Sequence, residues 1–94
     1  MPKFIIERDL PNIGEADQAS LSAAAEKSNA VLSAMQSEDK DIQWQHSYVA
    51  GDKTFCVYEC ANEELIHEHS ERSGFPANSI TEVKNQIDPS TAGV

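Results

Sequence analysis

The chain has 94 residues, enough for one domain with a single modest hydrophobic core and too few for two. Its apolar fraction of 39% is that of a folded globular protein, which argues against intrinsic disorder. With 16 acidic and 7 basic residues, the net charge is −9, which opposes binding to nucleic acid and anionic membranes and favours cations, including metal ions.

The first residues of the chain and its two cysteines bear on the compartment in which we expect the protein. The apolar run within residues 1–7 is far too short for a signal peptide or a membrane span. Cys56 and Cys60 lie four residues apart on one expected strand, about 13 Å from each other, so they cannot form a disulfide there. Because free thiols are usual in a reducing compartment, we expect a cytoplasmic protein.

The first third of the chain predicts a strand followed by a helix. Residues 3–8 are strand-like, and the loop residues at 9–14 end this strand. Arg8 stands between two acidic residues, and we expect it to be held in an ion pair. Either Asp17 or Ser20 is a suitable cap for the helix that follows. Apolar and small residues recur there at helical spacing, at Leu21, Ala24, Ala25, Ser28, Leu32 and Met35.

The middle of the chain predicts a β-hairpin. Two runs rich in β-branched and aromatic residues, 42–49 and 54–59, flank a short loop in which Gly51 can take the positive φ of a tight turn. Strand alternation gives one face of this hairpin Trp44, His46, Tyr48, Phe55, Val57 and Glu59. The other face receives Gln43, Gln45, Ser47, Val49, Thr54, Cys56, Tyr58 and Cys60. Both faces mix polar and apolar residues, which indicates that both are covered and suggests a partner subunit.

The last third predicts a second helix and a last strand. Asn62 is a good cap for a helix that runs to about residue 73. Gly74 can supply the left-handed residue after it, and Pro76 prevents its continuation. Residues 79–87 are expected to form the last strand, and residues 88–94 a short polar tail.

The predicted order is β-α-β-β-α-β, which is the order of the ferredoxin-like α+β fold. We therefore expect a single domain over residues 1–94, with an antiparallel sheet and both helices on one face. The other face of the sheet also needs cover. The common solution in such small sheets is a two-fold homodimer, of the dimeric α+β barrel type.

Imidazoles and nearby carboxylates are the candidate chemical groups, because together they suit divalent nickel, copper, zinc or cobalt. Each histidine also has a plain structural explanation. His67 can be an exposed helical residue that pairs with a carboxylate one turn away, or it can form a surface metal site with Glu63 or Glu71, completed by water or a second molecule. His69 can be a half-buried core residue, and His46 can contact a carboxylate or tyrosine on its own sheet face. The candidate metal ligands are His46, His67, His69, Glu59 and Glu63.

The motifs of other functions do not occur in the sequence. There is no Cys-x-x-Cys pair, no Gly-rich dinucleotide or phosphate loop, and no basic aromatic patch for nucleic acid. A Cys-His nucleophile is disfavoured because the cysteines and His46 are expected on opposite faces of the hairpin. We therefore expect a binding protein rather than an enzyme. Two alternatives remain: an enzyme or small-ligand binder with a pocket around His46, Tyr48 and Glu59, and an interaction module whose histidines have no special role.

Several short motifs, spread over nearly the whole chain, resemble those of one family. They are ERDLP at 7–11, AAEKS at 24–28, IQWQHSYV at 42–49, DKTFCVY at 52–58, EH at 68–69, GFPA at 74–77 and IDPSTA at 87–92. The chain resembles the small bacterial family of nickel-binding, ferredoxin-like proteins long filed as a domain of unknown function. This resemblance implies a homodimer, Ni²⁺ bound near the dimer surface, and a role in nickel sequestration or response.

Overall fold

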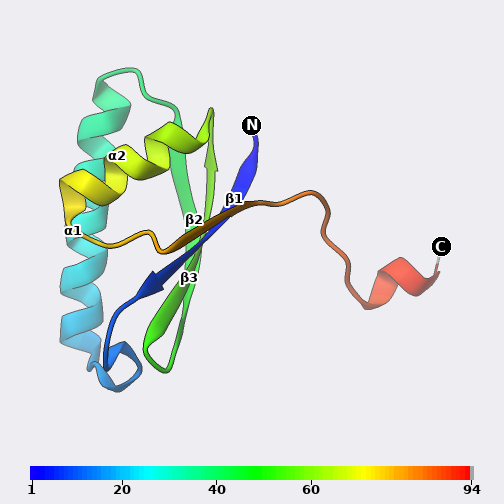
Figure 1. Ribbon diagram of the computed structural model, residues 1–94, viewed down its shortest axis with the longest axis horizontal. Coiled ribbons are helices and arrows are strands. Elements are labelled where there is room, and N and C mark those ends of the chain that lie inside the picture. Colours follow the sequence, from blue (N-terminus) through cyan, green and yellow to red (C-terminus); the bar gives the residue numbers. More distant parts are fainter. Residues whose placement is uncertain (94) are drawn as a thin grey trace.

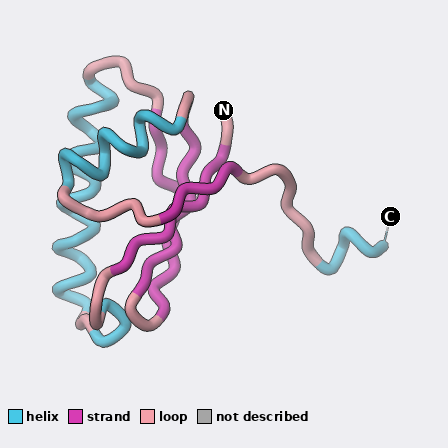
Figure 2. Tube along the Cα trace, viewed as in Figure 1, coloured by secondary structure: helices cyan, strands magenta, loops and turns pink. Residues whose placement is uncertain are grey.

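The computed structural model describes residues 1–93 and shows a four-stranded antiparallel sheet with two helices on one face (Figure 1). The elements are β1 (Lys3–Asp9), α1 (Gln18–Ser37), β2 (Ile42–Ala50), β3 (Lys53–Cys60), α2 (Glu63–Ser73) and β4 (Ser79–Glu82). The strands stand in the order β2-β3-β1-β4. The element order and the layering, which is plain in Figure 2, are those of the ferredoxin-like α+β fold expected from the sequence.

The hairpin of β2 and β3 forms where the sequence predicts it, with a two-residue turn at 51–52. Gly51 has φ of +62°, the left-handed conformation that favours glycine. A short 3-10 helix, Ile13–Glu15, packs on this turn, and the Gly14 amide donates a hydrogen bond to the Gly51 carbonyl over 2.7 Å. A Cβ on Gly14 would lie 2.7 Å from that same oxygen, so the close approach requires glycine there.

The predicted division of the hairpin side chains between two faces is correct for one half of β2 and wrong for the other. Tyr48 pairs with Phe55, and His46 pairs with Val57, as expected. The register shifts between Trp44 and His46, so Trp44 lies opposite the buried Tyr58 and faces the helices. A β-bulge at this point gives β2 one extra residue, and every side chain before the bulge changes face.

The first helix packs on the sheet through the stripe predicted from its spacing. Its N-terminal cap is Asp17, whose Oδ1 accepts a hydrogen bond from the Ser20 amide over 2.9 Å. The residues it buries are Ser28, Leu32 and Met35. The apolar core between the helices and the sheet consists of Phe4, Ile6, Leu32, Met35, Ile42, Cys56, Tyr58, Cys60 and Ile66.

The second helix also begins and ends as predicted, between the Asn62 cap and Gly74, whose φ is +82°. The strand predicted over 79–87 is wrong in its extent, because β4 ends at Glu82. Its partner β1 begins at Lys3, whose carbonyl accepts the last hydrogen bond, from the Val83 amide. Beyond that point the chain has no strand to pair with. It leaves the body of the domain toward a short 3-10 helix, Pro89–Gly93 (Figure 1). Within the expected tail, Val94 lies outside the described residues.

The second face of the sheet carries no helix of the described chain (Figure 1). Two cross-strand rows run over its centre, Ile5–Val57–His46 and Glu7–Phe55–Tyr48. Tyr48 is 63% exposed, and Ile5 is exposed as well. This face therefore presents apolar and aromatic side chains to solvent.

Candidate metal site

His67 and Glu63 form a pair on the outer surface of α2. They stand four residues apart, one helical turn, and His67 Nε2 lies 3.2 Å from Glu63 Oε2. Both side chains are more than half exposed, at 56% and 54%. An imidazole nitrogen and a carboxylate oxygen that already face each other are two suitable ligands for a divalent transition metal.

His69, two residues further along α2, lies in the core. It is 1% exposed, its Nε2 lies 3.1 Å from Ser28 Oγ, and its ring centroid lies 5.5 Å from that of Tyr58. Burial, together with the positive charge of Arg8, lowers the pKa of His69 to about 4. His69 is therefore a buried core residue, which is the structural explanation that the sequence offered for it.

His46 and Glu59 lie on the face of the sheet that the helices leave free. The ring of His46 meets the ring of Tyr48 edge-on, with centroids 5.2 Å apart. Glu59 stands opposite Gln43 rather than His46, because the bulge in β2 shifts the register, and its carboxylate lies 4.0 Å from Lys3 Nζ. The expected contact between His46 and Glu59 is therefore not formed.

The five predicted ligands thus occupy separate places, and the structure brings together two of them, His67 and Glu63. Within residues 1–93, no group of three or more His, Cys, Asp or Glu side chains is placed to hold a metal ion. The thiols do not complete a site: Cys56 and Cys60 are both free and buried, and burial raises the pKa of Cys60 to about 11. The His67–Glu63 pair fits nickel chemistry as a partial site, and the full ligand set stays a prediction.

The sequence model of a family described as "Nickel responsive protein SCO4226-like" matches residues 4–83. The chain belongs to this family. Among solved structures, it is similar to SCO4226 from Streptomyces coelicolor A3(2), with a TM-score of 0.71 and 22% sequence identity over 90% of this chain and 99% of that one. At that identity the likeness shows a common fold. No curated protein matches the chain.

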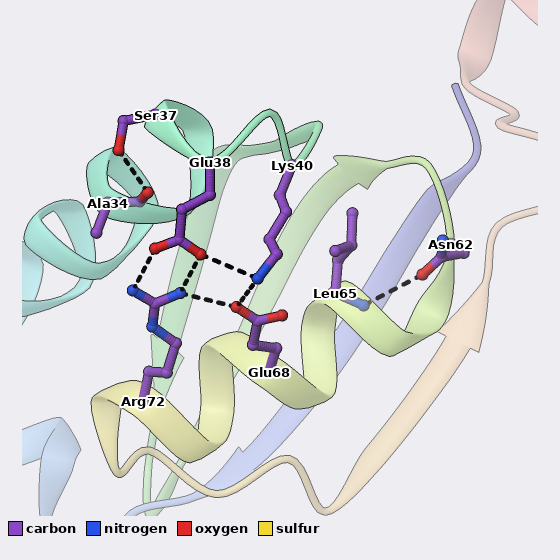
Figure 3. Close-up of polar contacts among 8 residues, drawn as sticks. All are labelled: Ala34, Ser37, Glu38, Lys40, Asn62, Leu65, Glu68 and Arg72. Carbon is purple, nitrogen blue, oxygen red and sulfur yellow. Dashed lines mark hydrogen bonds and ion pairs between the residues drawn. The ribbon is translucent and has the colours of Figure 1, made fainter.

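Beside the His67–Glu63 pair, this SCO4226-like chain carries a network of four charged side chains that the sequence did not reveal (Figure 3). Lys40 Nζ lies 3.0 Å from Glu38 and 2.7 Å from Glu68. Arg72 Nη2 lies 3.0 Å from Glu38 Oε2, and Arg72 Nη1 lies 2.8 Å from Glu68 Oε2. The network joins α2 to the connection between α1 and β2. The spacing of Glu68 and Arg72 on one helix was a visible signal, whereas the contact of Glu68 with Lys40 spans 28 positions of the chain and that of Arg72 with Glu38 spans 34.

These ion pairs shift the pKa values of their members. Hydrogen bonds from Arg72 and then Lys40 lower the pKa of Glu38 to about 2, and hydrogen bonds from Lys40 and then Arg72 lower the pKa of Glu68. The Glu68 carboxylate is therefore already paired with two cationic side chains. The carboxylate that contacts His67 is that of Glu63, and Glu71, one turn further along α2, makes no ion pair within residues 1–93.

A cavity of about 210 Å³ lies between α1 and the sheet in this family member. Its walls include Trp44, Tyr58 and the buried Arg8, and they include none of His46, Tyr48 and Glu59. This cavity is therefore not the pocket expected around those three residues, because they lie on the opposite side of the sheet, and that pocket stays a prediction. Arg8 also differs from expectation, since it makes no ion pair with a residue in the range 1–93.

Neither helix of the part that the structure describes has the length and apolar character that a membrane crossing requires.

Proposed function

We propose that this chain is a non-enzymatic, cytoplasmic nickel-binding protein that sequesters nickel or takes part in the response to it. Membership of a family described as nickel-responsive supports this proposal. The observation that carries it is the exposed pair of His67 and Glu63, 3.2 Å apart at the surface of an acidic protein. The two free thiols are in keeping with a reducing compartment.

Two protein ligands are fewer than a nickel ion requires, so the proposed site is completed by water or by a second copy of the chain. Nickel(II) favours nitrogen and oxygen ligands, but copper(II) binds such sites more tightly than nickel(II) does. The function therefore depends on which metal the cell supplies. In this proposal nickel is a cargo or a signal that the protein holds, and no step of chemistry is performed on it.

The proposed assembly is a homodimer that stacks the free faces of two sheets. The two cross-strand rows centred on Val57 and Phe55 offer an apolar patch, and ion pairs of Lys53 with Glu7 and Asp9 border it. A patch of this composition is a usual protein–protein contact surface. Two-fold symmetry would place the same rows against each other, so each copy would cover the other.

Calorimetric titration of nickel into the wild type and single variants tests the ligand assignment. We expect His67→Ala and Glu63→Gln each to weaken nickel binding at least about tenfold. Loss of a group that only orients a metal ligand already lowers metal affinity by about this factor, and loss of a ligand should cost no less. Glu64→Gln is the matched control, because it removes the neighbouring charge on the same turn of α2 without touching His67.

The variants of the other histidines complete this test. His69→Ala should leave nickel affinity unchanged, because His69 is buried and hydrogen-bonded in the core. Nickel binding that survives both His67→Ala and Glu63→Gln would contradict the assignment. Loss of binding in His46→Ala instead would move the site to the free face of the sheet.

A further inference from the structure

The cavity between α1 and the sheet has the form of a small binding site. Small side chains of α1, Ala24 and Ala25, form one wall, and Trp44 and Tyr58 form the floor on the sheet. Phe75, from the segment after α2, contributes a further apolar side chain. The cavity is partly open to solvent and mostly apolar. At about 210 Å³ it is somewhat larger than the ~150 Å³ cavity that accommodates benzene in another protein.

A cationic group without a counterion lines this apolar space. Arg8 is 3% exposed, and its Nη1 donates hydrogen bonds to Pro76 O over 2.8 Å and to Ser70 Oγ over 3.0 Å. Its Nη2 is also buried and has no hydrogen-bond partner within residues 1–93. The guanidinium carbon stands 6.0 Å from the centre of the Tyr58 ring, a contact that does not satisfy the free N–H groups.

This arrangement is costly unless something else joins it. A buried charge requires a partner, and a buried donor left unpaired loses the free energy of its bond with water. No carboxylate within residues 1–93 forms an ion pair with Arg8, and its two acidic neighbours in the sequence, Glu7 and Asp9, both pair with Lys53. The neighbouring His69 is no counterion, since an imidazole is either neutral or cationic. Burial and the charge of Arg8 lower its pKa to about 4, so it is neutral near pH 7.

We propose that the cavity binds a small monocarboxylic acid with an apolar body, whose carboxylate pairs with the Arg8 guanidinium and whose apolar part lies between Ala24 and Trp44. The structure of the site selects this class. One cationic side chain in apolar walls matches a single negative charge, whereas a phosphate group would bring more charge than the site compensates. Ser28 and Thr54 also line the cavity and are its small polar residues. This site is separate from the nickel ligands proposed above.

The sole tryptophan of the chain, Trp44, makes binding measurable by fluorescence, since its ring lines the cavity. Three probes share one ring and differ in charge: phenylacetate, the neutral phenylacetamide and the cationic benzylamine. In metal-free buffer we expect phenylacetate to bind at least about tenfold more tightly than the other two. Replacing one member of a buried charge pair by a neutral group weakens binding by at least this factor. Equal binding of all three probes, or no change in fluorescence with phenylacetate, would overturn the proposal.

Two variants and one matched control locate the site. Ala24→Leu fills the cavity and should abolish phenylacetate binding, whereas Ala23→Leu on the exposed side of the same helix should retain it. Arg8→Met should remove the preference for phenylacetate over phenylacetamide. Unchanged binding in folded Ala24→Leu would contradict the location. If Ala24→Leu does not fold, the comparison of the three probes on the wild type still decides.

Discussion

His69 illustrates how the environment of one side chain decides its chemistry. The sequence offers three imidazoles of equal intrinsic pKa, and α2 places two of them two residues apart. Residues two apart on a helix point away from each other, so His67 reaches solvent and His69 reaches Ser28 and Tyr58 in the core. The Nδ1 atom of His69 is buried without a hydrogen-bond partner within residues 1–93. Protonation there would add a charge with no acceptor, which burial disfavours.

This environment predicts that the protein loses stability as the pH falls from 6.5 toward 4. The pKa of His69 is about 4 in the folded protein against 6.5 as its ordinary value, so between these limits the unfolded chain binds the extra proton. The loss should amount to roughly 3 kcal/mol at most, since one pKa unit corresponds to ~1.4 kcal/mol. His69→Gln should flatten this part of the pH dependence, and His67→Gln should not. Urea unfolding measured from pH 4 to 7 checks both variants, and equal slopes for all three proteins would refute the assignment.

The single-residue level is also where sequence prediction fails in the hairpin. A bulge adds one residue to β2, and this changes the face of Trp44 without changing any propensity. A signal existed: the inward-facing residues are Ile42 and Trp44 before the bulge and Ser47 and Val49 after it, so the alternation changes phase. The sequence does not reveal this change, because a serine is not expected to face inward. Ser47 does so because its Oγ accepts a hydrogen bond from the Trp44 indole N–H over 2.8 Å.

At the scale of helices and strands, prediction worked where the signal is local. The cap Asn62 and the left-handed Gly74 each act within one turn of their own helix, so the sequence contains the whole cause. For α1 the sequence offered both Asp17 and Ser20, and the structure has Asp17 as the cap. The end of β4 depends on β1, more than 70 residues earlier, because pairing stops where β1 has no more residues. The cavity and the four-residue charge network likewise depend on contacts between distant segments, so the sequence alone did not reveal them.

The charge network between α2 and the connection after α1 predicts a second pH dependence. The pKa of Glu38 is about 2 in the folded protein against an ordinary value of 4.5, so its ion pairs stabilise the protein above pH 4.5 and are lost as the pH falls toward 2. The wild type should be slightly more stable than Glu38→Gln at pH 6, and this small advantage should vanish near pH 2. The effect is small because the pairs are exposed to solvent.

Thermal unfolding at pH 6 and pH 2.5 measures this difference, and high salt should reduce it at pH 6 by screening. The matched control is Glu26→Gln, which removes an exposed carboxylate of α1 that has no ion pair within residues 1–93. A stability difference between wild type and Glu38→Gln that persists unchanged at low pH and in salt would show that packing of the Glu38 side chain, rather than its charge, is responsible.

At the scale of the whole molecule, the two sides of the sheet are unequal. One side packs on both helices and encloses the core, and the other exposes the rows around Val57 and Phe55 (Figure 1). The segment after β4 leaves the domain, and its Ile87 is 78% exposed. Exposed apolar groups on a face and on a projecting arm both cost free energy in water. A second copy of the chain against the free face would remove this cost for the face.

The proposed dimer predicts that the wild type sediments as a dimer and that Val57→Glu converts it to a folded monomer. By two-fold symmetry each dimer would bury two such charges without partners, at a cost of several kcal/mol. Since ~1.4 kcal/mol corresponds to a tenfold change, the dissociation constant should rise by about 100-fold or more. Ala30→Glu places the same charge on the exposed side of α1 and should leave the dimer intact. Sedimentation velocity over a range of concentrations distinguishes the cases, and a wild type that remains monomeric throughout would contradict the proposed dimer.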